Sequence, residues 1–188
     1  LDKRHAEAKA KAQLASQDTQ FAAYEQAVES SEAVICRPFA EVQRLVHSED
    51  EVYGTYYQRV NAGLRLSTGS GWDRLRAIAD NILFGDLNKQ HIRFASLTLD
   101  GLGLPHYGDC SLVLRSKFIA HRASAFEENS VVFMEHHNVH AVGDFSLPHG
   151  YRSSWEDRAK LAVTKVMAGL GFTRANLAEE LQHPGASG

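Results

Sequence analysis

Cysteines are scarce in this sequence, and their scarcity excludes several classes of protein. Only Cys36 and Cys110 occur among the 188 residues. Two thiols are too few for a disulfide-rich secreted scaffold, and they cannot form a structural zinc site alone. We therefore expect two reduced, half-buried cysteines in a protein that works in a reducing compartment.

Long apolar runs are also missing. No stretch approaches the roughly 18 residues that a membrane-spanning helix needs. The first residues, Leu1 to Lys11, alternate charged side chains with alanine, which is unlike a secretory signal. We expect no membrane partner and, because no methionine begins the sequence, we expect a fragment of a longer protein.

The sequence lacks the common signatures of nucleotide binding and hydrolysis. It contains no GxxxxGK[ST], no GxGxxG after a strand, no GxSxG and no HExxH. The Gly-rich stretch from Ser67 to Gly71 has neither the lysine nor the preceding strand of a phosphate-binding loop, so we interpret it as a linker.

Composition favours one globular domain over residues 1–188, with 44% hydrophobic and 23% charged residues. The net charge of −3 is unevenly spread. From Arg59 to Arg122 there are nine Lys/Arg against five Asp/Glu, whereas the rest has eleven against eighteen. The basic middle suits an anionic ligand, either a pyrophosphate or a nucleic-acid backbone. A solvated surface with chance clustering explains the same count.

The N-terminal part, residues 1–89, has the patterns of helices. We predict four of them: Thr19 to Ala33, a helix after Pro38, a run from a Ser48/Glu51 capping box to Gly63, and Trp72 to Gly85.

Residues 90–155 change to the patterns of strands. The predicted strands are His91 to Leu99, Cys110 to Leu114, Ser130 to Met134 and Asn138 to Val142. A second capping box, Ser153 with Glu156, predicts a helix to Gly169, and a last helix spans Thr173 to Leu181, so residues 156–188 are helical. The predicted class is α+β: a helical N-terminal part, then a small, mostly antiparallel split β core, then C-terminal helices.

Ten histidines make a metal site worth testing. Glu135, His136, His137 and His140 lie close together, but on a strand Glu135 and His137 would share one face while His136 and His140 share the other. Because zinc needs three or four convergent ligands, we predict solvated histidines and no metal.

The richest segment for chemistry is Pro105 to Ser130. A buried strand there is followed by a polar cluster, and a strand can hold such groups rigidly at the lip of a pocket. A helix cap and turn around Glu127 to Ser130 is the alternative reading. The cluster consists of Arg122, Ser124, Glu128, Asn129 and Ser130.

Several runs in this region resemble an uncharacterised bacterial domain family. They are Arg93-Phe94-Ala95-Ser96-Leu97, Pro105-His106-Tyr107-Gly108-Asp109-Cys110, Arg122-Ala123-Ser124-Ala125-Phe126 and Asn129-Ser130. The same order also resembles toxin ADP-ribosyltransferases of the polymorphic, or Rhs C-terminal, kind. In those toxins a helical lobe precedes a split β core that binds NAD.

The resemblance to these toxins implies a set of site residues. His106-Tyr107-Gly108 is similar to the His-Gly start of one class, and Arg93 followed by Ser124 is similar to the Arg-then-Ser order of the other. The implied catalytic residues are His106, Ser124 and Glu135; the implied NAD-binding residues are Arg93, Tyr107, Arg122 and Phe126.

The late glutamate of the resemblance stays open between Glu135 and Glu156. A carboxylate there favours the positive charge that develops on the ribose as nicotinamide leaves. The only Glu-x-Glu, Glu49-Asp50-Glu51, precedes the strands, which counts against the type that modifies protein arginines.

The resemblance implies a delivered effector that acts in the cytoplasm of a target cell. It would modify a protein or a structured RNA with ADP-ribose from NAD, and a cognate immunity protein would plug its cleft. Two alternatives remain. One is a nuclease or hydrolase toxin that uses His106, His121, His137 and Glu135; the other is a non-enzymatic interaction module.

Overall fold

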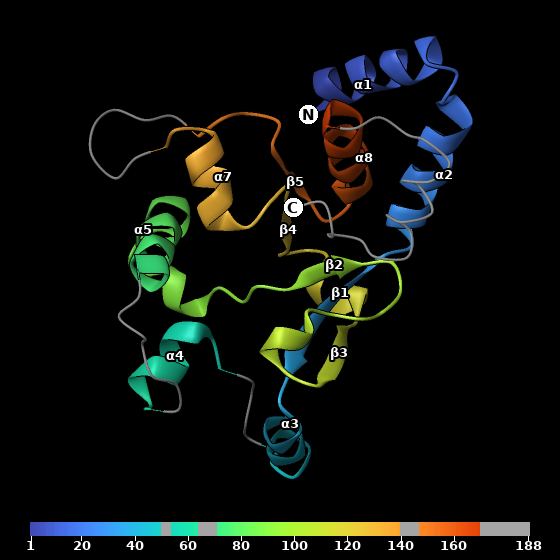
Figure 1. The fold of residues 1–188 in the computed structure, drawn as a ribbon. Helices are drawn as coiled ribbons and strands as arrows, with labels where there is room; N and C mark the ends of the chain where they lie inside the picture. The colour runs from blue at the N-terminus through green and yellow to red at the C-terminus, as the bar shows by residue number, and fades with distance from the viewer. Residues whose placement is uncertain (50–53, 64–70, 140–146, 170–188) are drawn as a thin grey trace. The chain divides into compact units, whose positions relative to one another are not determined.

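The computed structural model describes residues 1–49, 54–63, 71–139 and 147–169. Its class is α+β, with N-terminal helices, small antiparallel sheets and a C-terminal helix, which confirms the predicted class (Figure 1). The chain forms two compact units. Unit 1 consists of Leu1–Arg37, Ala95–Glu127 and Pro148–Gly188, and unit 2 consists of Pro38–Phe94 and Glu128–Leu147.

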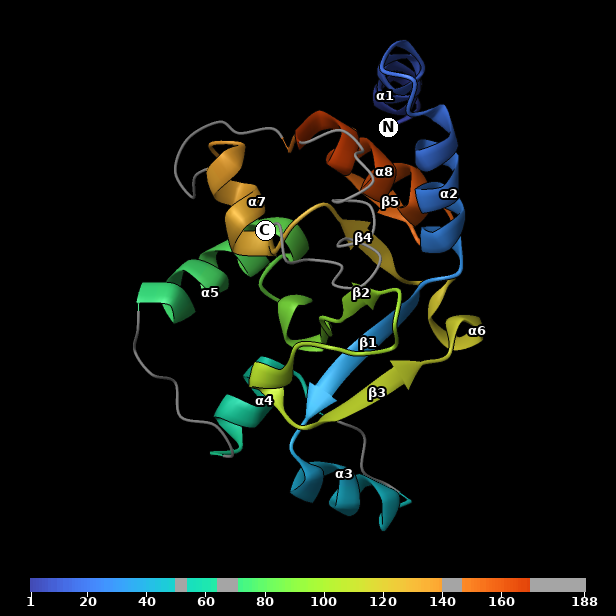
Figure 2. The same ribbon diagram turned by 45° about the vertical axis from the view of Figure 1, so that its right-hand side comes forward.

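A three-stranded antiparallel sheet lies in unit 1. Strand β1 (Glu32–Arg37) runs between β2 (Ser96–Thr98) and β3 (Cys110–Leu114), as Figure 2 shows. Val34 is paired with Ser96 on one side and with Val113 on the other. The sequence prediction missed β1, since these residues were assigned to a helix and to the segment after it. The β3 prediction is confirmed.

Three helices cover the other part of unit 1. They are α1 (Asp2–Leu14), α2 (Asp18–Glu29) and α8 (Arg158–Gly169), which lie side by side in Figures 1 and 2. Among the helices that the structure describes, none is both long and apolar enough to cross a membrane. Their shared core consists of Ala8, Ala12, Phe21, Tyr24, Val28, Ala159, Val163 and Met167.

A buried guanidinium joins α8 to the turn between α2 and β1. Arg158 is 9% exposed, and it donates to the carbonyl oxygens of Trp155 (2.8 Å) and Glu29. It also stacks on the Trp155 ring at 4.3 Å. Burial lowers the pKa of Arg158, but these acceptors satisfy the charged group.

Unit 1 also contains a two-stranded ladder of β4 (Ser124–Phe126) and β5 (Arg152–Ser154). The short helices η2 (Pro105–Tyr107) and α6 (Ser116–Ile119) flank β3. The residues before η2 pass close over β1, since a Cβ on Gly103 would lie 2.6 Å from the Cys36 sulfur. Both cysteines are free thiols, and Cys36 is buried.

Unit 2 consists of helices. These are α3 (Phe39–Val46), α4 (Tyr56–Asn61), α5 (Gly71–Phe84), η1 (Lys89–His91) and α7 (Ser130–His136). Pro38 is the N-cap of α3 and Gly85 follows α5 at φ 77°, as predicted. The capping box of α4 is formed by Thr55 and Gln58, whereas the predicted partner of Ser48, Glu51, lies outside the described residues.

The prediction of a strand at Ser130 to Met134 is wrong, because these residues begin α7. The Asn129 side chain caps this helix by accepting a hydrogen bond from the Val131 amide at 3.0 Å. Val131 and Met134 are buried one turn apart, a spacing typical of a helix face. Burial of that face and a good cap outweigh the β propensity of the two valines.

Three other predicted elements need correction. The strand expected from His91 to Leu99 is confined to β2, because η1 occupies its first residue. Asn138 has φ 51° and stands in a turn after α7, so the predicted strand does not begin there; its residues 140–142 lie outside the described residues. The helix expected from Ser153 begins only at Arg158, because Ser153 lies in β5. The predicted helix 173–181 lies outside the described residues, as do residues 67–70 of the predicted linker.

Candidate functional site

The β4–β5 ladder brings polar side chains together on one face of unit 1. Ser124 is paired with Ser154, and Phe126 with Arg152. Because alternate residues of a strand share a face, these four side chains point to the same side. Ser124, Ser154 and Arg152 are exposed there, and Phe126 is half-buried. The face therefore combines two hydroxyls, a guanidinium and an aromatic ring.

Two charged residues lie at the same end of the ladder, beyond the pair of Ser124 and Ser154, because Arg122 precedes β4 and Glu156 follows β5 in an antiparallel pairing. Arg122, two residues before Ser124, is exposed, and its amide donates to the Ile119 carbonyl at 2.9 Å. Glu156, two residues after Ser154, is also exposed. The intervening Trp155 is buried, so the backbone that carries Glu156 is anchored between β5 and α8. We define this set as the ladder face: Arg122, Ser124, Phe126, Arg152, Ser154 and Glu156.

The predicted pair His106 and Tyr107 lies on η2, also in unit 1. Their ring centroids are 4.0 Å apart, and both side chains are exposed. The short helix contacts β1, and Gly108 ends it at φ 146°. The structure thus presents an imidazole and a phenol as an exposed pair of rings, tilted by 44° to each other, beside the larger sheet.

The remaining two predicted residues, Arg93 and Glu135, belong to unit 2. Arg93 is exposed and its guanidinium is 3.4 Å from the His91 carbonyl oxygen that accepts its hydrogen bond. Glu135 is exposed in the last turn of α7. The expectation that Glu135 ends an apolar strand is wrong, because its backbone is helical.

The basic middle of the sequence is divided between the two units. Arg59 is bound to Glu41 at 2.7 Å, and Lys89 to Asp86 at 2.5 Å, within unit 2. Arg115, Lys117 and Arg122 belong to unit 1 and are exposed. The structure therefore describes these basic residues as two groups, one in each unit.

The neighbouring histidines His136 and His137, at the end of α7, contact different residues. His136 Nδ1 lies 2.7 Å from a carboxylate oxygen of Glu128, and the His137 ring packs on Phe133 with centroids 4.7 Å apart. In the part of the chain that the structure describes, no three His, Cys, Asp or Glu side chains converge as metal ligands do. His140 lies outside that part.

The buried carboxylate of Asp80 was not predicted from the sequence. Asp80 of α5 is 1% exposed; it accepts hydrogen bonds from Tyr57 (2.8 Å) and Ser130 (3.4 Å). Burial raises the pKa of Asp80, and burial together with the bond to Asp80 raises the pKa of Tyr57. The carboxylate joins α4, α5 and α7, and since it is inaccessible we assign it a structural role. A charged residue beside the apolar positions Ala79 and Ile82 was the only sequence signal.

Comparisons with other proteins leave the α+β class as the firm description of this chain. No protein-family model, no curated protein and no solved structure matches it. The function must therefore be argued from the residues themselves.

Proposed function

We propose that the chain is a toxin-like ADP-ribosyltransferase that uses NAD as its substrate. The observation that carries the proposal is the ladder face, on which Ser124 and Phe126 lie together with Arg152, Ser154 and the nearby Glu156. It supplies a hydroxyl, an aromatic ring, cations and a carboxylate within one compact unit.

The chemistry requires these groups for separate reasons. When the bond between nicotinamide and ribose breaks, nicotinamide leaves with the bonding electrons and the ribose carbon becomes positively charged. A fixed carboxylate stabilises that charge. A nucleophile of the target then bonds to the same carbon and loses its proton. Guanidinium groups suit the diphosphate, since they form paired hydrogen bonds to its oxygens, and an aromatic ring suits nicotinamide.

Among the two late glutamates, Glu156 fits this role better. It shares unit 1 with Ser124 and His106, and its backbone is held between β5 and the start of α8. Glu135, on a helix of unit 2, is the comparison residue. In this assignment Arg122 binds the diphosphate and Phe126 packs against nicotinamide. His106 remains a predicted catalytic residue, and Tyr107 and Arg93 remain predicted NAD contacts.

The proposal extends to the setting implied by the resemblance to polymorphic toxins. The protein would act in the cytoplasm of a target cell on a protein or a structured RNA, and a cognate immunity protein would block it. An immunity protein of this kind should cover the ladder face.

Transfer of a radioactive label from NAD tests the proposal. The protein is incubated with a cell lysate and NAD labelled in the adenylate, and labelled protein, labelled RNA and free nicotinamide are measured. Glu156→Gln should reduce nicotinamide release by about 10²-fold or more, and Ser124→Ala should reduce it as well. Glu135→Gln is the matched control, because this glutamate is also exposed, and it should retain activity.

Absence of both label transfer and nicotinamide release in the wild-type protein would refute the proposal. Cleavage of RNA or DNA without NAD would favour the hydrolase alternative instead. Loss of activity in Glu135→Gln, with full activity in Glu156→Gln, would transfer the carboxylate role to Glu135.

A further inference from the structure

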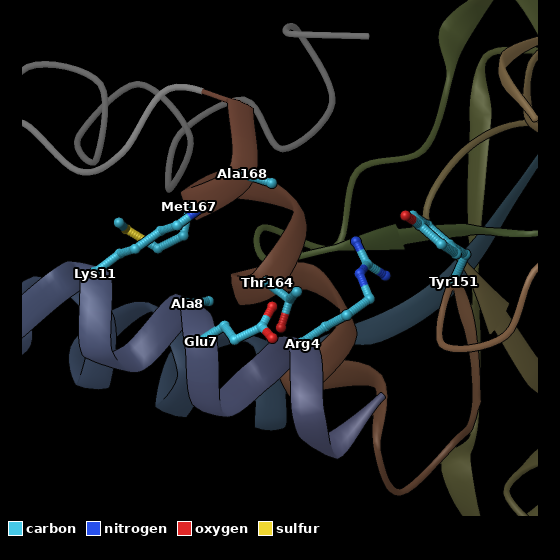
Figure 3. A pocket seen from close by; sticks show the side chains of 8 residues that line it. All are labelled: Arg4, Glu7, Ala8, Lys11, Tyr151, Thr164, Met167 and Ala168. Atoms are coloured by element: carbon cyan, nitrogen blue, oxygen red, sulfur yellow. The ribbon is translucent and has the colours of Figure 1, made fainter.

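A second site in unit 1 is a pocket of about 260 Å³ between α1 and α8 (Figure 3). Arg4, Glu7 and Lys11 follow one another on α1 at spacings of three and four residues, so they share a face of the helix. Thr164 and Met167 of α8 line the opposite side. In Figure 3, Glu7 and Thr164 lie between Arg4 at one end and Lys11 at the other.

The Thr164 hydroxyl is the first sign that the pocket has a ligand. The residue is only 3% exposed, and among the described residues its Oγ1 has no hydrogen-bond partner. Buried hydroxyls in folded proteins nearly always have a partner, because leaving one unpaired is unfavourable. The Oγ1 atom has almost no accessible surface in this structure, so a polar atom of a molecule in the pocket would become its partner once the Thr164 side chain rotates toward the pocket.

Within the described part of the chain, Arg4 uses only one of its nitrogens, Nη1, as a hydrogen-bond donor. Its Nη1 donates to Glu127 (2.6 Å) and to the Gly150 carbonyl oxygen, and its guanidinium lies flat on the Tyr151 ring at 3.7 Å. These contacts fix the plane of the group, so Nε and Nη2 are available in a constant orientation. Arg4 is thereby preorganised to bind an anion.

Glu7 determines what else such a ligand must carry. Its carboxylate lines the pocket between the two cations, Arg4 and Lys11, so a bare anion would be repelled there. Hydrogen-bond donors next to the anionic group would instead face Glu7 and Thr164 favourably.

We propose that this pocket binds a small phosphorylated ligand with sugar hydroxyls beside its phosphoryl group. Arg4 and Lys11 hold the phosphoryl oxygens, and Glu7 and Thr164 bond to the hydroxyls. The volume is sufficient for a ligand of pentose phosphate size. The inference does not rest on ADP-ribosyl transfer, because binding is measured without NAD.

The two methionines of the chain provide a local readout. Met167 lines the pocket, whereas Met134 is buried in α7 of unit 2. With methionine labelled by ¹³C at its methyl group, ribose 5-phosphate at about 1 mM should shift the NMR signal of Met167 and leave that of Met134 in place. Met134→Leu assigns the two signals.

Ligand comparisons identify the recognised chemistry. Ribose 5-phosphate should bind more tightly than inorganic phosphate or ribose, each of which offers half of the contacts. AMP carries the same group on a nucleotide. Tighter binding of AMP than of ribose 5-phosphate would indicate a nucleotide source, and the reverse a free sugar phosphate; either result supports the proposal.

Variants test the residues. Lys11→Met and Thr164→Val should each weaken ribose 5-phosphate binding by about fivefold to tenfold. Lys9→Met is the control, because Lys9 is an exposed lysine of the same helix that does not line the pocket. Absence of a Met167 shift with all four ligands would overturn the proposal. Equal affinity of Lys11→Met, Lys9→Met and wild type would overturn it too, since binding would then occur elsewhere.

Discussion

Replacing Thr164 by valine should stabilise the unliganded protein. Valine has the shape of threonine with a methyl group in place of the hydroxyl, and the two residues have similar helix propensity. The hydroxyl is buried and has no hydrogen-bond partner among the residues that the structure describes, and an unsatisfied buried group costs about 1–3 kcal/mol. Burying a methyl group instead contributes about 0.8 kcal/mol.

Together these terms give an expected gain for Thr164→Val of about 2–4 kcal/mol in the free energy of unfolding, or about 4–16 °C in Tm for a chain of this length. Urea denaturation followed by circular dichroism measures it. Thr98→Val is the matched control in the same unit, since Thr98 is also 3% exposed. Its hydroxyl is bonded to Asp100 at 2.5 Å, so this variant should lose about 1–2 kcal/mol.

The reasoning about the pocket would be refuted if Thr164→Val lost as much stability as Thr98→Val. That result would mean that the Thr164 hydroxyl has a partner in the folded protein. The pocket would then lack the unpaired group that indicates a ligand.

Three further predictions concern other parts of the fold. Arg158→Met should lower the free energy of unfolding by about 2–4 kcal/mol, because it removes the donor from several buried carbonyl oxygens; a loss below about 0.5 kcal/mol in urea denaturation would contradict this. Gly103→Ala should lower the free energy of unfolding by about 1–3 kcal/mol in the same measurement, since its Cβ would meet Cys36 and Val34. Gly71→Ala is the control and should leave the free energy of unfolding nearly unchanged, because a Cβ on Gly71 would meet open space. Asp80 has a raised pKa in the folded state, so the folded protein binds the Asp80 proton more tightly than the unfolded chain does. The contribution of this proton to the free energy of unfolding is fully present below the ordinary pKa of 3.8 and is lost as the pH rises through the folded pKa. The wild type should therefore lose stability relative to Asp80→Asn over that range of pH. Parallel profiles of unfolding free energy against pH for the two proteins would contradict this prediction.

The helices were the most predictable part of the fold. α3, α4 and α5 have apolar residues at helical spacing, and Pro38, Gly63 and Gly85 mark where helices begin or end. These signals depend only on residues close together in the sequence, so they can be recognised without knowing the fold. The α+β class followed from the same patterns.

The missed elements depend on contacts distant in sequence. β1 has a continuous apolar run, Ala33 to Cys36, typical of a strand buried on both faces, but its neighbours in the sheet come some 60 to 80 residues later. The valines of α7 favoured a strand, and only burial against α5 and the Asn129 cap decide for a helix. In short apolar segments the tertiary partner determines the conformation.

The candidate site was predictable only in part for the same reason. Arg122, Ser124 and Phe126 form a local run, and β4 keeps them in the predicted order. Their partners Arg152 and Ser154 come from a strand that the sequence analysis had assigned to a helix cap or left unassigned. Similarly, the pocket joins Arg4 to Thr164, residues from opposite ends of the described chain, so no local motif could reveal it.

The pocket proposal also predicts how ligand changes the comparison of Thr164→Val with the wild type. Without ligand the variant is more stable by about 2–4 kcal/mol. Ligand that binds only the folded protein stabilises it in proportion to the logarithm of its concentration divided by Kd. A tenfold weaker affinity therefore costs the variant about 1.4 kcal/mol of that stabilisation when ligand is in large excess. The two Tm values, separate without ribose 5-phosphate, should therefore move closer together at high ligand concentration, whereas those of Lys9→Met and the wild type should rise together throughout. Parallel curves for Thr164→Val and the wild type would mean that this hydroxyl does not contact the ligand.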